Sequence, residues 1–187
     1  MRLINGEECS SPEEMWCIIS NNIESNYTRW KSTYHTLSIA YVGDALAPTL
    51  ATVVLRHFDG DQKTLRFHTD SRSAKFNAKV LSAMHYHRDE PWQVRYQGIP
   101  EINHMDETAL SRWETLTNAQ KKCYQIDYAP GTVIDTMPGY HANGLDHFAI
   151  ITLRMTAIDM LYLHHQGHIR ARLTFNDGKW SSCWLSP

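Results

Sequence analysis

The most informative segment of this sequence is residues 50–79, LATVVLRHFDGDQKTLRFHTDSRSAKFNAK. Its apolar and β-branched run Thr52–Leu55 is typical of a strand, and Asp59-Gly60-Asp61 supplies the residues of a tight turn. In the run that follows, Leu65 and Phe67 alternate with polar residues, which predicts a second strand with one buried face. The segment therefore predicts a β-hairpin.

The end of this segment combines hydroxyl groups, cations and a predicted helix start. Residues 70–75, DSRSAK, lead into a helix that we expect from about Ser73 to Ser82. The first turn of a helix has free backbone N–H groups and a positive dipole, so it suits a phosphate group. The same residues also fit ordinary helix capping beside solvated cations. A phosphate site is therefore one of two interpretations of these residues.

The composition is that of one folded domain. The chain has 187 residues, of which 42% are hydrophobic and 20% charged, so it can bury a substantial core as a single domain, 1–187. A net charge of −2 without a basic block argues against a nucleic-acid partner. No apolar run approaches the roughly 18 residues of a membrane span, and the amino terminus lacks the apolar region of a signal peptide. We expect a cytoplasmic protein with no membrane partner.

The cysteines and histidines do not predict a metal site. The four cysteines are scattered without a CxxC pair, so free thiols are the simplest expectation. His85-x-His87 and His164-His165-x-x-His168 supply imidazoles, the commonest metal ligands. Neither group has a cysteine or carboxylate at zinc-like spacing, and we expect no metal.

Two principal helices are predicted beside the strands. Ser11, Pro12 and Glu14 form a helix start with a capping box. The apolar stripe of this first helix comprises Met15, Ile19, Ile23, Tyr27 and Trp30. Asp106 caps a second long helix, whose stripe comprises Ala109, Leu110, Trp113, Leu116 and Cys123.

The rest of the chain predicts short antiparallel strands. The clearest is 92–102, where Trp92, Val94 and Tyr96 share one face. Further strands are expected at 35–42, 83–87, 148–157, 158–163, 170–175 and 179–185, and residues 129–146 form a long irregular connection. A closed or half-closed barrel is expected, because closure removes exposed edges. Its parts are a helix in 1–34, a first barrel half in 35–102, a helix and loop in 103–147 and a second barrel half in 148–187.

Several motifs, in this order and spacing, resemble those of the pyridoxamine 5'-phosphate oxidase family, and in particular a bacterial branch related to that oxidase. They are Val53-Val54-Leu55-Arg56-x-Phe58-Asp59, Phe67-His68-Thr69-Asp70-x-x-Ser73-x-Lys75, Gln93-Val94-x-x-x-Gly98, Arg170-x-Arg172 and the final Trp-Leu-Ser-Pro. The resemblance implies a mainly β fold with flanking helices, namely a six-stranded antiparallel split barrel that binds FMN. It also implies a homodimer with the flavin at the subunit interface.

The resemblance implies particular cofactor contacts. Arg56, Ser73 and Lys75 would hold the flavin phosphate, and Gln93 would hydrogen-bond the ring. Arg172 would approach from the second subunit. The full set of implied cofactor residues is Val53, Val54, Arg56, His68, Thr69, Arg72, Ser73, Lys75, Gln93, Tyr162 and Arg172. Gly131 and Thr132 stand about where a partner loop reaches the flavin in the family.

The sequence departs from the family at several positions. Ala51 and Ala74 replace arginines that the family usually carries, and Arg72 is a candidate replacement on the same loop. On the substrate side, His168 and Arg170 have the chemical types of the family's Arg-x-His in exchanged order. We expect these two residues to orient the substrate. The family's Tyr/Arg/Ser cluster on the second helix has no clear match near residues 124–128.

Three functions remain open from the sequence. The first is an FMN-dependent oxidoreductase that takes hydride from a small substrate, which the resemblance extends to a phosphorylated amine. The second is a flavin- or haem-binding split barrel without oxidase turnover, with the histidines of 164–168 as candidate ligands. The third is a barrel that has lost its cofactor and serves as a dimerisation domain, for which Ala51 and Ala74 are the main support.

Overall fold

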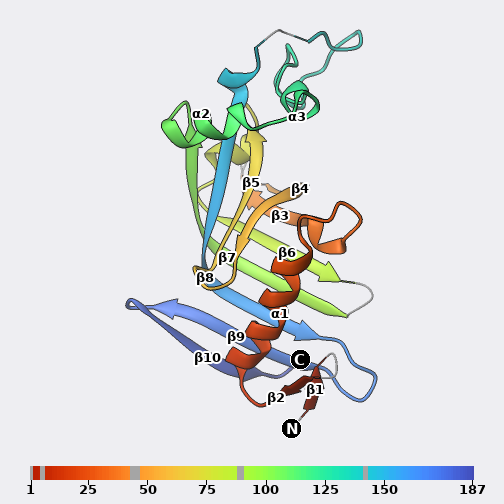
Figure 1. Ribbon diagram of the computed structural model, residues 1–187, viewed down its shortest axis with the longest axis vertical. Coiled ribbons are helices and arrows are strands. Elements are labelled where there is room, and N and C mark those ends of the chain that lie inside the picture. The colour runs from red at the N-terminus through yellow and green to blue at the C-terminus, as the bar shows by residue number, and fades with distance from the viewer. Residues whose placement is uncertain (1, 5–6, 43–46, 88–90, 141–142) are drawn as a thin grey trace.

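The computed structural model describes residues 2–4, 7–42, 47–87, 91–140 and 143–187 (Figure 1). Six antiparallel strands form a closed ring in the order β8-β5-β4-β3-β6-β7, and β7 pairs with β8 to close it. These strands are β3 (Thr36–Val42), β4 (Pro48–Asp59), β5 (Thr64–Asp70), β6 (Leu81–His87), β7 (Trp92–His104) and β8 (Phe148–Tyr162). The predicted six-stranded antiparallel barrel is confirmed.

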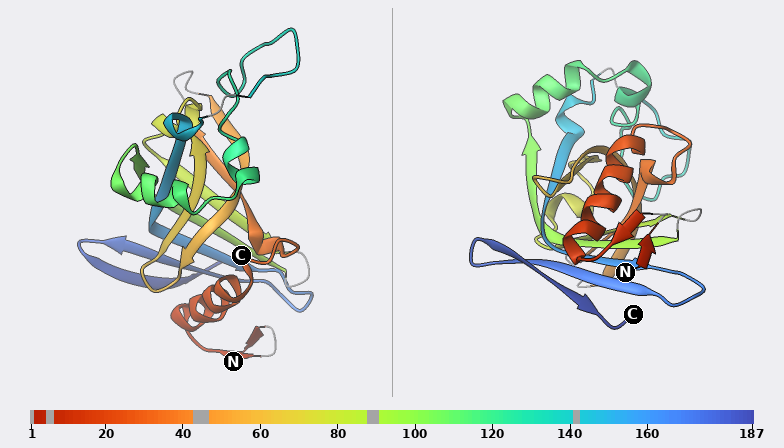
Figure 2. Two further views of the ribbon diagram at one scale, coloured as in Figure 1. Left: turned by 45° about the horizontal axis from the view of Figure 1, so that its top comes forward. Right: turned by 60° about the horizontal axis from the view of Figure 1, so that its bottom comes forward.

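Strand β8 changes its partner halfway along. Phe148–Arg154 pairs with β5, whereas Ala157–Tyr162 pairs with β9 (Ile169–Asn176), which leads into β10 (Lys179–Leu185). The expectation of two separate strands, 148–157 and 158–163, is wrong, because β7 pairs with β8 along nearly its whole length and only the partner on the other edge of β8 changes, from β5 to β9. The β9–β10 hairpin leaves the barrel as a separate layer at its lower end (Figures 1 and 2).

The predicted alternation correctly identifies the core faces. Leu65 and Phe67 of β5 are fully buried, and so are Trp92, Val94 and Tyr96 of β7. Intervening residues such as Gln93 and Arg95 stand on the outer face of the barrel. The outer face can therefore carry the polar chemistry.

Helix α1 (Pro12–Asn26) covers one flank of the barrel and hairpin, as predicted (Figure 1). The Ser11 hydroxyl accepts a hydrogen bond from the Glu14 N–H, and Met15, Ile19 and Ile23 are completely buried. Trp30 was wrongly assigned to the buried stripe, because the helix ends before it and its side chain is 77% exposed.

Two helix predictions are wrong. Residues 74–77 form only a single 3₁₀ turn, η2 (Ala74–Asn77), because the chain enters β6 at Leu81, where burial of Leu81 and Ala83 favours strand pairing. The second long helix is broken into α2 (Glu107–Glu114) and α3 (Asn118–Lys122). Thr117 caps α3 and forms a capping box with Gln120, so a new helix starts there.

The remaining elements are short. They are the hairpin of β1 (Arg2–Ile4) and β2 (Glu7–Cys9) and the 3₁₀ turns η1 (Thr33–His35) and η3 (Leu145–His147). After α3 the chain forms the predicted irregular connection, which projects from the barrel and is joined at its base by a bridge between Ile126 and Tyr140 (Figure 1). Among the described residues, none of the helices combines the length and apolar character needed to cross a membrane.

Candidate functional site

A hollow of about 270 Å³ lies beside β4, β5 and the end of α3. We refer to it as the upper hollow. It brings together several predicted cofactor residues, namely Val53, Val54, Arg56, His68, Thr69 and Lys75. Thr52, Asp70, Cys123 and Tyr124 complete its lining. The two strands of the predicted hairpin therefore supply most of its wall.

Arg56 and Lys75 make this hollow positive. Among the described residues, the half-buried Arg56 guanidinium has no hydrogen-bond or ion-pair partner. The Lys75 ammonium donates to the Ser73 hydroxyl at 3.2 Å, and burial lowers the pKa of Lys75. A guanidinium without an acceptor, beside a second cation in a partly buried site, is suited to an anion that supplies the missing acceptor.

A buried pair of hydroxyl groups lies beside these cations. The Thr69 and Ser73 hydroxyls are 3.1 Å apart, and the Ser73 hydroxyl donates to the Asp70 carbonyl at 2.8 Å. These bonds hold the Asp70–Ser73 turn against the end of β5. Since η2 is a single turn, the expected helix dipole is absent, and an anion here depends on side-chain donors.

His68 is neutral in this setting. Burial, together with the charges of Arg112, Arg56 and Arg66, lowers its pKa to about 3. The Arg112 Nε donates to the His68 Nε2 at 3.4 Å, so Nε2 is the acceptor nitrogen of the imidazole. The positive charge of this region is therefore carried by the arginines and Lys75.

Arg72 makes different contacts from those expected of a phosphate ligand. Its Nε and Nη2 donate to the two oxygens of Asp70 at 3.0 and 2.8 Å, and Nη2 also donates to the Ile126 carbonyl at 3.1 Å. Its Nη1 donates to the Asp127 carbonyl at 3.3 Å. Arg72 does not line the upper hollow; it ties the Asp70 turn to the base of the projecting connection.

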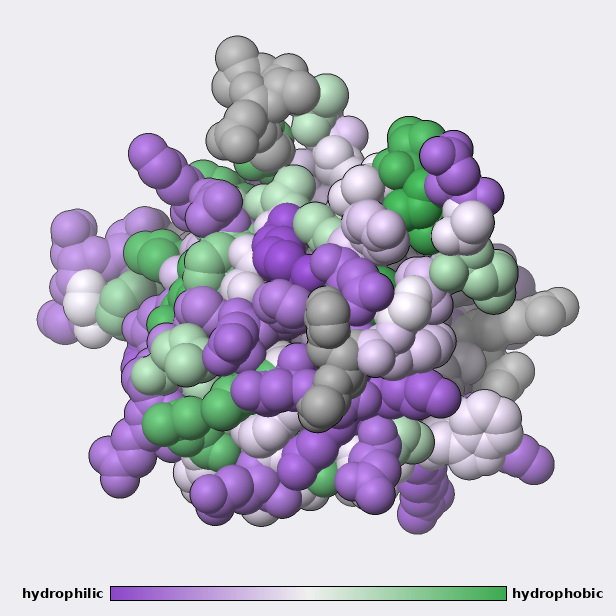
Figure 3. All heavy atoms as spheres, turned by 90° about the horizontal axis from the view of Figure 1, so that it is seen from above, coloured by the Kyte–Doolittle hydropathy of each residue, from purple (hydrophilic) through white to green (hydrophobic). Residues whose placement is uncertain are grey.

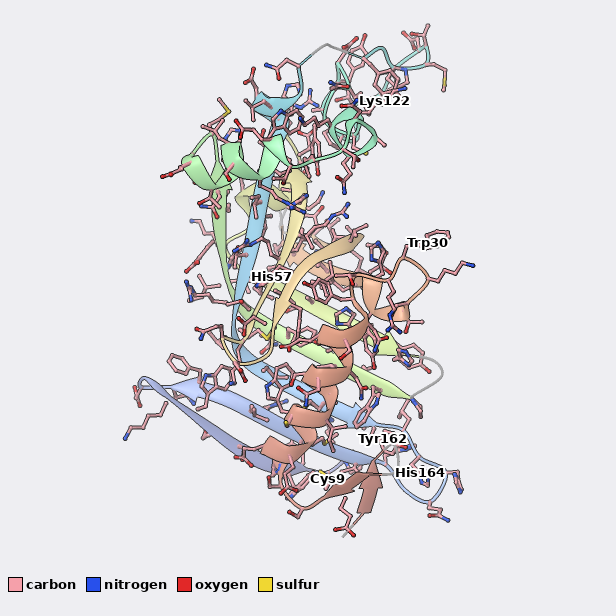
Figure 4. The ribbon with its side chains drawn as sticks, in the orientation of Figure 1. Cys9, Trp30, His57, Lys122, Tyr162 and His164 are labelled. Carbon is pink, nitrogen blue, oxygen red and sulfur yellow. The ribbon has the colours of Figure 1, made fainter. Side chains whose placement is uncertain are left out.

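The other predicted residues form a second group on β7, β8, β9 and the turn before β9. Gln93 pairs in register with Leu161, and Leu161 pairs with Arg170. Figure 4 shows Tyr162 and His164 at the lower end of the molecule. It shows Lys122, which precedes Cys123 of the upper hollow in the sequence, at the upper end. One chain therefore does not bring Tyr162 and the β8–β9 turn to the upper hollow.

Within this second group, the side chains have defined neighbours. Tyr162 is only 7% exposed, and its ring lies 4.5 Å from that of Trp92, so it is part of the core. The His164 N–H donates to the His168 Nδ1 at 3.2 Å. Arg170 and Arg172 both donate to Asp159.

Two further hollows contain residues that contact the candidate residues described above. The outer hollow, of about 380 Å³, lies on the outer barrel face and is lined by Leu50, Met84, Arg95, Asp159 and Arg172 among others. The α2 hollow, of about 490 Å³, includes Arg66 and Arg112 with Glu107 and several hydroxyl side chains. The end of the molecule that bears α2 and α3 is largely hydrophilic, with separate apolar groups (Figure 3).

Sequence reasoning missed Arg112, Cys123 and Tyr124. Arg112 contacts His68 from α2, and the break between α2 and α3 brings Cys123 and Tyr124 to the upper hollow. Burial raises the pKa of Tyr124, whose ring packs 5.1 Å from Phe148. The Thr-x-x-Gln capping box at Thr117 was the available signal that a new helix starts there.

The donor set of the upper hollow fits a phosphate group such as that of FMN. The Arg56 guanidinium, which has no hydrogen-bond or ion-pair partner among the described residues, the Lys75 ammonium and the Thr69 hydroxyl line a space beside β4 and β5. The buried Ser73 hydroxyl contacts both Thr69 and Lys75. A cluster of three or more His, Cys, Asp or Glu side chains suited to a metal ion is not found within the described ranges. The closed six-stranded ring, with this cationic hollow at its edge, has the architecture of a split-barrel protein.

Comparison with known proteins supports the resemblance. Residues 13–104, just under half of the chain, match the family model described as "Pyridoxamine 5'-phosphate oxidase, FMN-binding domain". The resemblance seen in the sequence motifs is confirmed for these residues, which are similar to the FMN-binding domain of that family. A search of curated proteins finds no significant match.

Solved structures share the fold. A pyridoxamine 5'-phosphate oxidase-related, FMN-binding protein from Nostoc punctiforme PCC 73102 is 22% identical, with a TM-score of 0.76 over 92% of this chain and 97% of its own. PhzG from Burkholderia lata 383, solved with tetrahydrophenazine-1-carboxylic acid, is 12% identical, with a TM-score of 0.72 over 100% and 98%. A protein related to general stress protein 26, from Clostridium acetobutylicum, is 16% identical, with a TM-score of 0.52 over 84% and 94%. These likenesses establish the split-barrel architecture.

Proposed function

We propose that this protein is an FMN-dependent oxidoreductase that acts as a homodimer on a small anionic substrate. The observation that carries the proposal is the half-buried Arg56 beside Lys75, which has no hydrogen-bond or ion-pair partner in the described part of the chain. Both line a hollow whose strands belong to the residues that match an FMN-binding family model. A dianionic phosphate supplies the acceptors that these cations lack, and each such charge-assisted bond contributes about 1.5–3 kcal/mol net.

The upper hollow is the proposed phosphate end of the cofactor site. Arg56 and Lys75 provide the charge, and Thr69 provides a hydroxyl on the wall of the hollow. Ser73 positions the Lys75 ammonium, because its hydroxyl accepts from Lys75 while donating to the Asp70 carbonyl. Val53, Val54 and His68 lie along the same wall, where the rest of the cofactor would extend. A neutral His68 limits charge repulsion with Arg112 and Arg66. Arg72 supports this site indirectly by holding Asp70.

A second copy of the chain supplies the rest of the proposed site. Tyr162, His168, Arg170 and Arg172 do not line the upper hollow of the same chain, and Tyr162 lies at the lower end of the molecule (Figure 4). In the proposed homodimer, Arg172 of one copy reaches the flavin held by the other. The outer barrel face, with its apolar Leu50 and Met84 beside Arg95, is the proposed contact surface.

The proposed substrate carries a negative charge. Arg170 and His168, from the second copy, are the proposed orienting groups. Arg66 and Arg112 line the α2 hollow, and Arg112 contacts His68 of the upper hollow. When bound, FMN supplies a hydride acceptor at its ring. The residues of the chain bind and orient the reactants. The guanidinium groups of Arg170 and of the α2 hollow favour an anionic substrate.

Purification followed by an absorbance spectrum and mass analysis of the released ligand tests this proposal. We expect bound FMN, and peroxide release when a phosphorylated amine such as pyridoxamine phosphate is oxidised in air. A protein that stays colourless after FMN addition and dialysis contradicts the proposal. Bound flavin without turnover of candidate amines, or a Soret band on haem addition, would instead support a binding protein without oxidase activity.

A further inference from the structure

One carboxylate on the outer barrel face is shared by three arginines. Asp159 Oδ1 accepts from Arg95 Nη2 at 2.9 Å and from Arg170 Nε at 3.1 Å. Its Oδ2 accepts from Arg170 Nη2 at 3.1 Å and from Arg172 Nη2 at 2.8 Å. Asp159 is 7% exposed, so both of its oxygens are engaged and largely shielded from water.

The strand register creates this arrangement. Arg95 on β7 and Arg172 on β9 stand directly opposite Asp159 on β8, while Arg170 is the diagonal neighbour. Directly opposite and diagonal positions on one sheet face are within reach of long side chains. Three guanidinium groups at these positions repel one another, and Asp159 compensates only one of their charges.

Strand pairing does not require such a cluster. On the same two strands, Glu101 of β7 pairs with Arg154 of β8 as a single exposed ion pair. Arg170 and Arg172, by contrast, are two neighbouring β9 residues whose guanidinium groups are both aimed at the same carboxylate. The cluster therefore specifies the direction of two adjacent arginines rather than the pairing of two strands.

We propose that Asp159 is a positioning residue that holds Arg170 and Arg172 in the orientation in which they meet the substrate and the flavin. This inference rests on the proposed function, which assigns those contacts to the two arginines. Asp159 itself touches neither reactant. Without its carboxylate the three guanidinium groups separate, and Arg172 no longer presents its N–H groups in one direction.

Replacing Asp159 by asparagine tests the inference, because two explanations predict opposite signs. Simple electrostatics predicts that Asp159→Asn, which removes a negative charge, strengthens binding of the anionic FMN. Loss of positioning predicts weaker binding, by about tenfold or more. We expect the weaker binding in a fluorescence titration with FMN, with Asp159→Glu restoring most of the affinity.

A double-mutant cycle identifies the route of the effect. If Asp159 acts through Arg172, Asp159→Asn has little further effect in an Arg172→Met background, and the visible spectrum of the flavin bound to Asp159→Asn resembles that bound to Arg172→Met. Glu101→Gln is the matched control, since it removes a carboxylate paired with one arginine across β7 and β8. We expect this control to bind FMN like the wild type.

The outcomes separate the two proposals. Wild-type protein that does not bind FMN overturns the proposed function and this inference with it. Wild-type binding together with equal or tighter binding by Asp159→Asn overturns only the inference, as does a full additive loss in the Arg172→Met background. Thermal unfolding of each variant identifies those that fail to fold. If Asp159→Asn does not fold, the FMN affinity of Asp159→Glu is compared with that of the wild type instead.

Discussion

Arg56 is the side chain on which the candidate cofactor site depends most. We expect Arg56→Met to weaken FMN binding by about tenfold to a hundredfold, the equivalent of one charge-assisted hydrogen bond. Because Arg56 has no hydrogen-bond or ion-pair partner within the described part of the chain, its removal should leave the melting temperature unchanged. Fluorescence titration and thermal unfolding measure the two effects.

The exposed Arg154, which forms an ion pair with Glu101, provides a control for the loss of one positive charge. Arg154→Gln should bind FMN like the wild type. Equal affinity losses in Arg56→Met and Arg154→Gln would show that overall charge, rather than the upper hollow, determines FMN affinity.

His85 makes stability depend on pH. It is 2% exposed, its Nδ1 lies 3.2 Å from the Tyr96 hydroxyl, and burial lowers its pKa from 6.5 to about 4. The unfolded chain therefore binds a proton at His85 more readily than the folded chain does. The contribution of neutral His85 to stability is complete above pH 6.5 and decreases as the pH falls toward about 4.

At about pH 5, this difference amounts to about 2 kcal/mol of lost unfolding free energy relative to neutral pH. His85→Gln keeps a polar group for Tyr96 but does not titrate, so it should lose about 2 kcal/mol less between neutral pH and about pH 5. Urea unfolding of both proteins at the two pH values measures the difference. An identical loss in the two proteins would exclude His85 as the titrating group.

At the scale of elements, Gly98 permits the close approach of β7 and β8. It stands at the register shift after Gln97, and a Cβ placed there would lie 1.9 Å from the Arg154 carbonyl oxygen. We expect Gly98→Ala to destabilise the protein by about 1–3 kcal/mol or more, because the obstructing atoms belong to the backbone. Its melting temperature should fall by about 3 °C or more.

The neighbouring exposed Gln97 supplies the control for this change. Gln97→Ala leaves the backbone contact intact and should melt close to the wild type. If Gly98→Ala also melts like the wild type, the close approach of the two strands does not require glycine.

The errors in helix prediction also belong to this scale. The run after Ser73 has residues suited to a helix, yet it forms one 3₁₀ turn because Leu81 and Ala83 gain more by entering the barrel wall. The apolar spacing of Leu110, Trp113 and Leu116 suggested one continuous helix, whereas Thr117 starts another. Strand pairing in the barrel therefore shortened the segment after Ser73 to one turn. A local capping signal at Thr117, which the apolar pattern obscured, divided the second helix.

At the scale of the whole molecule, the proposed homodimer is tested at Leu50. This side chain lines the outer hollow and is 77% exposed. Leu50→Lys places a charge in the proposed contact surface and should raise the dimer dissociation constant about a hundredfold. FMN binding should weaken in parallel, since Arg172 is proposed to come from the second copy. Sedimentation equilibrium and FMN titration measure both effects.

Trp30 is a matched control because it is apolar and also 77% exposed, but it lies between α1 and η1. Trp30→Lys should leave both association and FMN binding unchanged. A wild-type protein that remains monomeric at all concentrations would contradict the homodimer, as would equal effects of the two substitutions.

Alternating side chains determined much of this protein from the sequence by itself. The grouping of Arg56 with Ser73 and Lys75 was implied by the family resemblance, whereas the strands around Leu65, Phe67 and Trp92 and their buried faces follow from a period of two residues and a short hairpin. These are local properties, since neighbouring side chains of a strand point to opposite faces whatever the rest of the chain does. Only the tertiary structure decided that Arg72 binds Asp70, that three strands direct arginines at Asp159, and that the upper and lower groups of candidate residues lie apart. Those contacts depend on strand register and barrel closure, which join residues far apart in the sequence, and no local pattern specifies them.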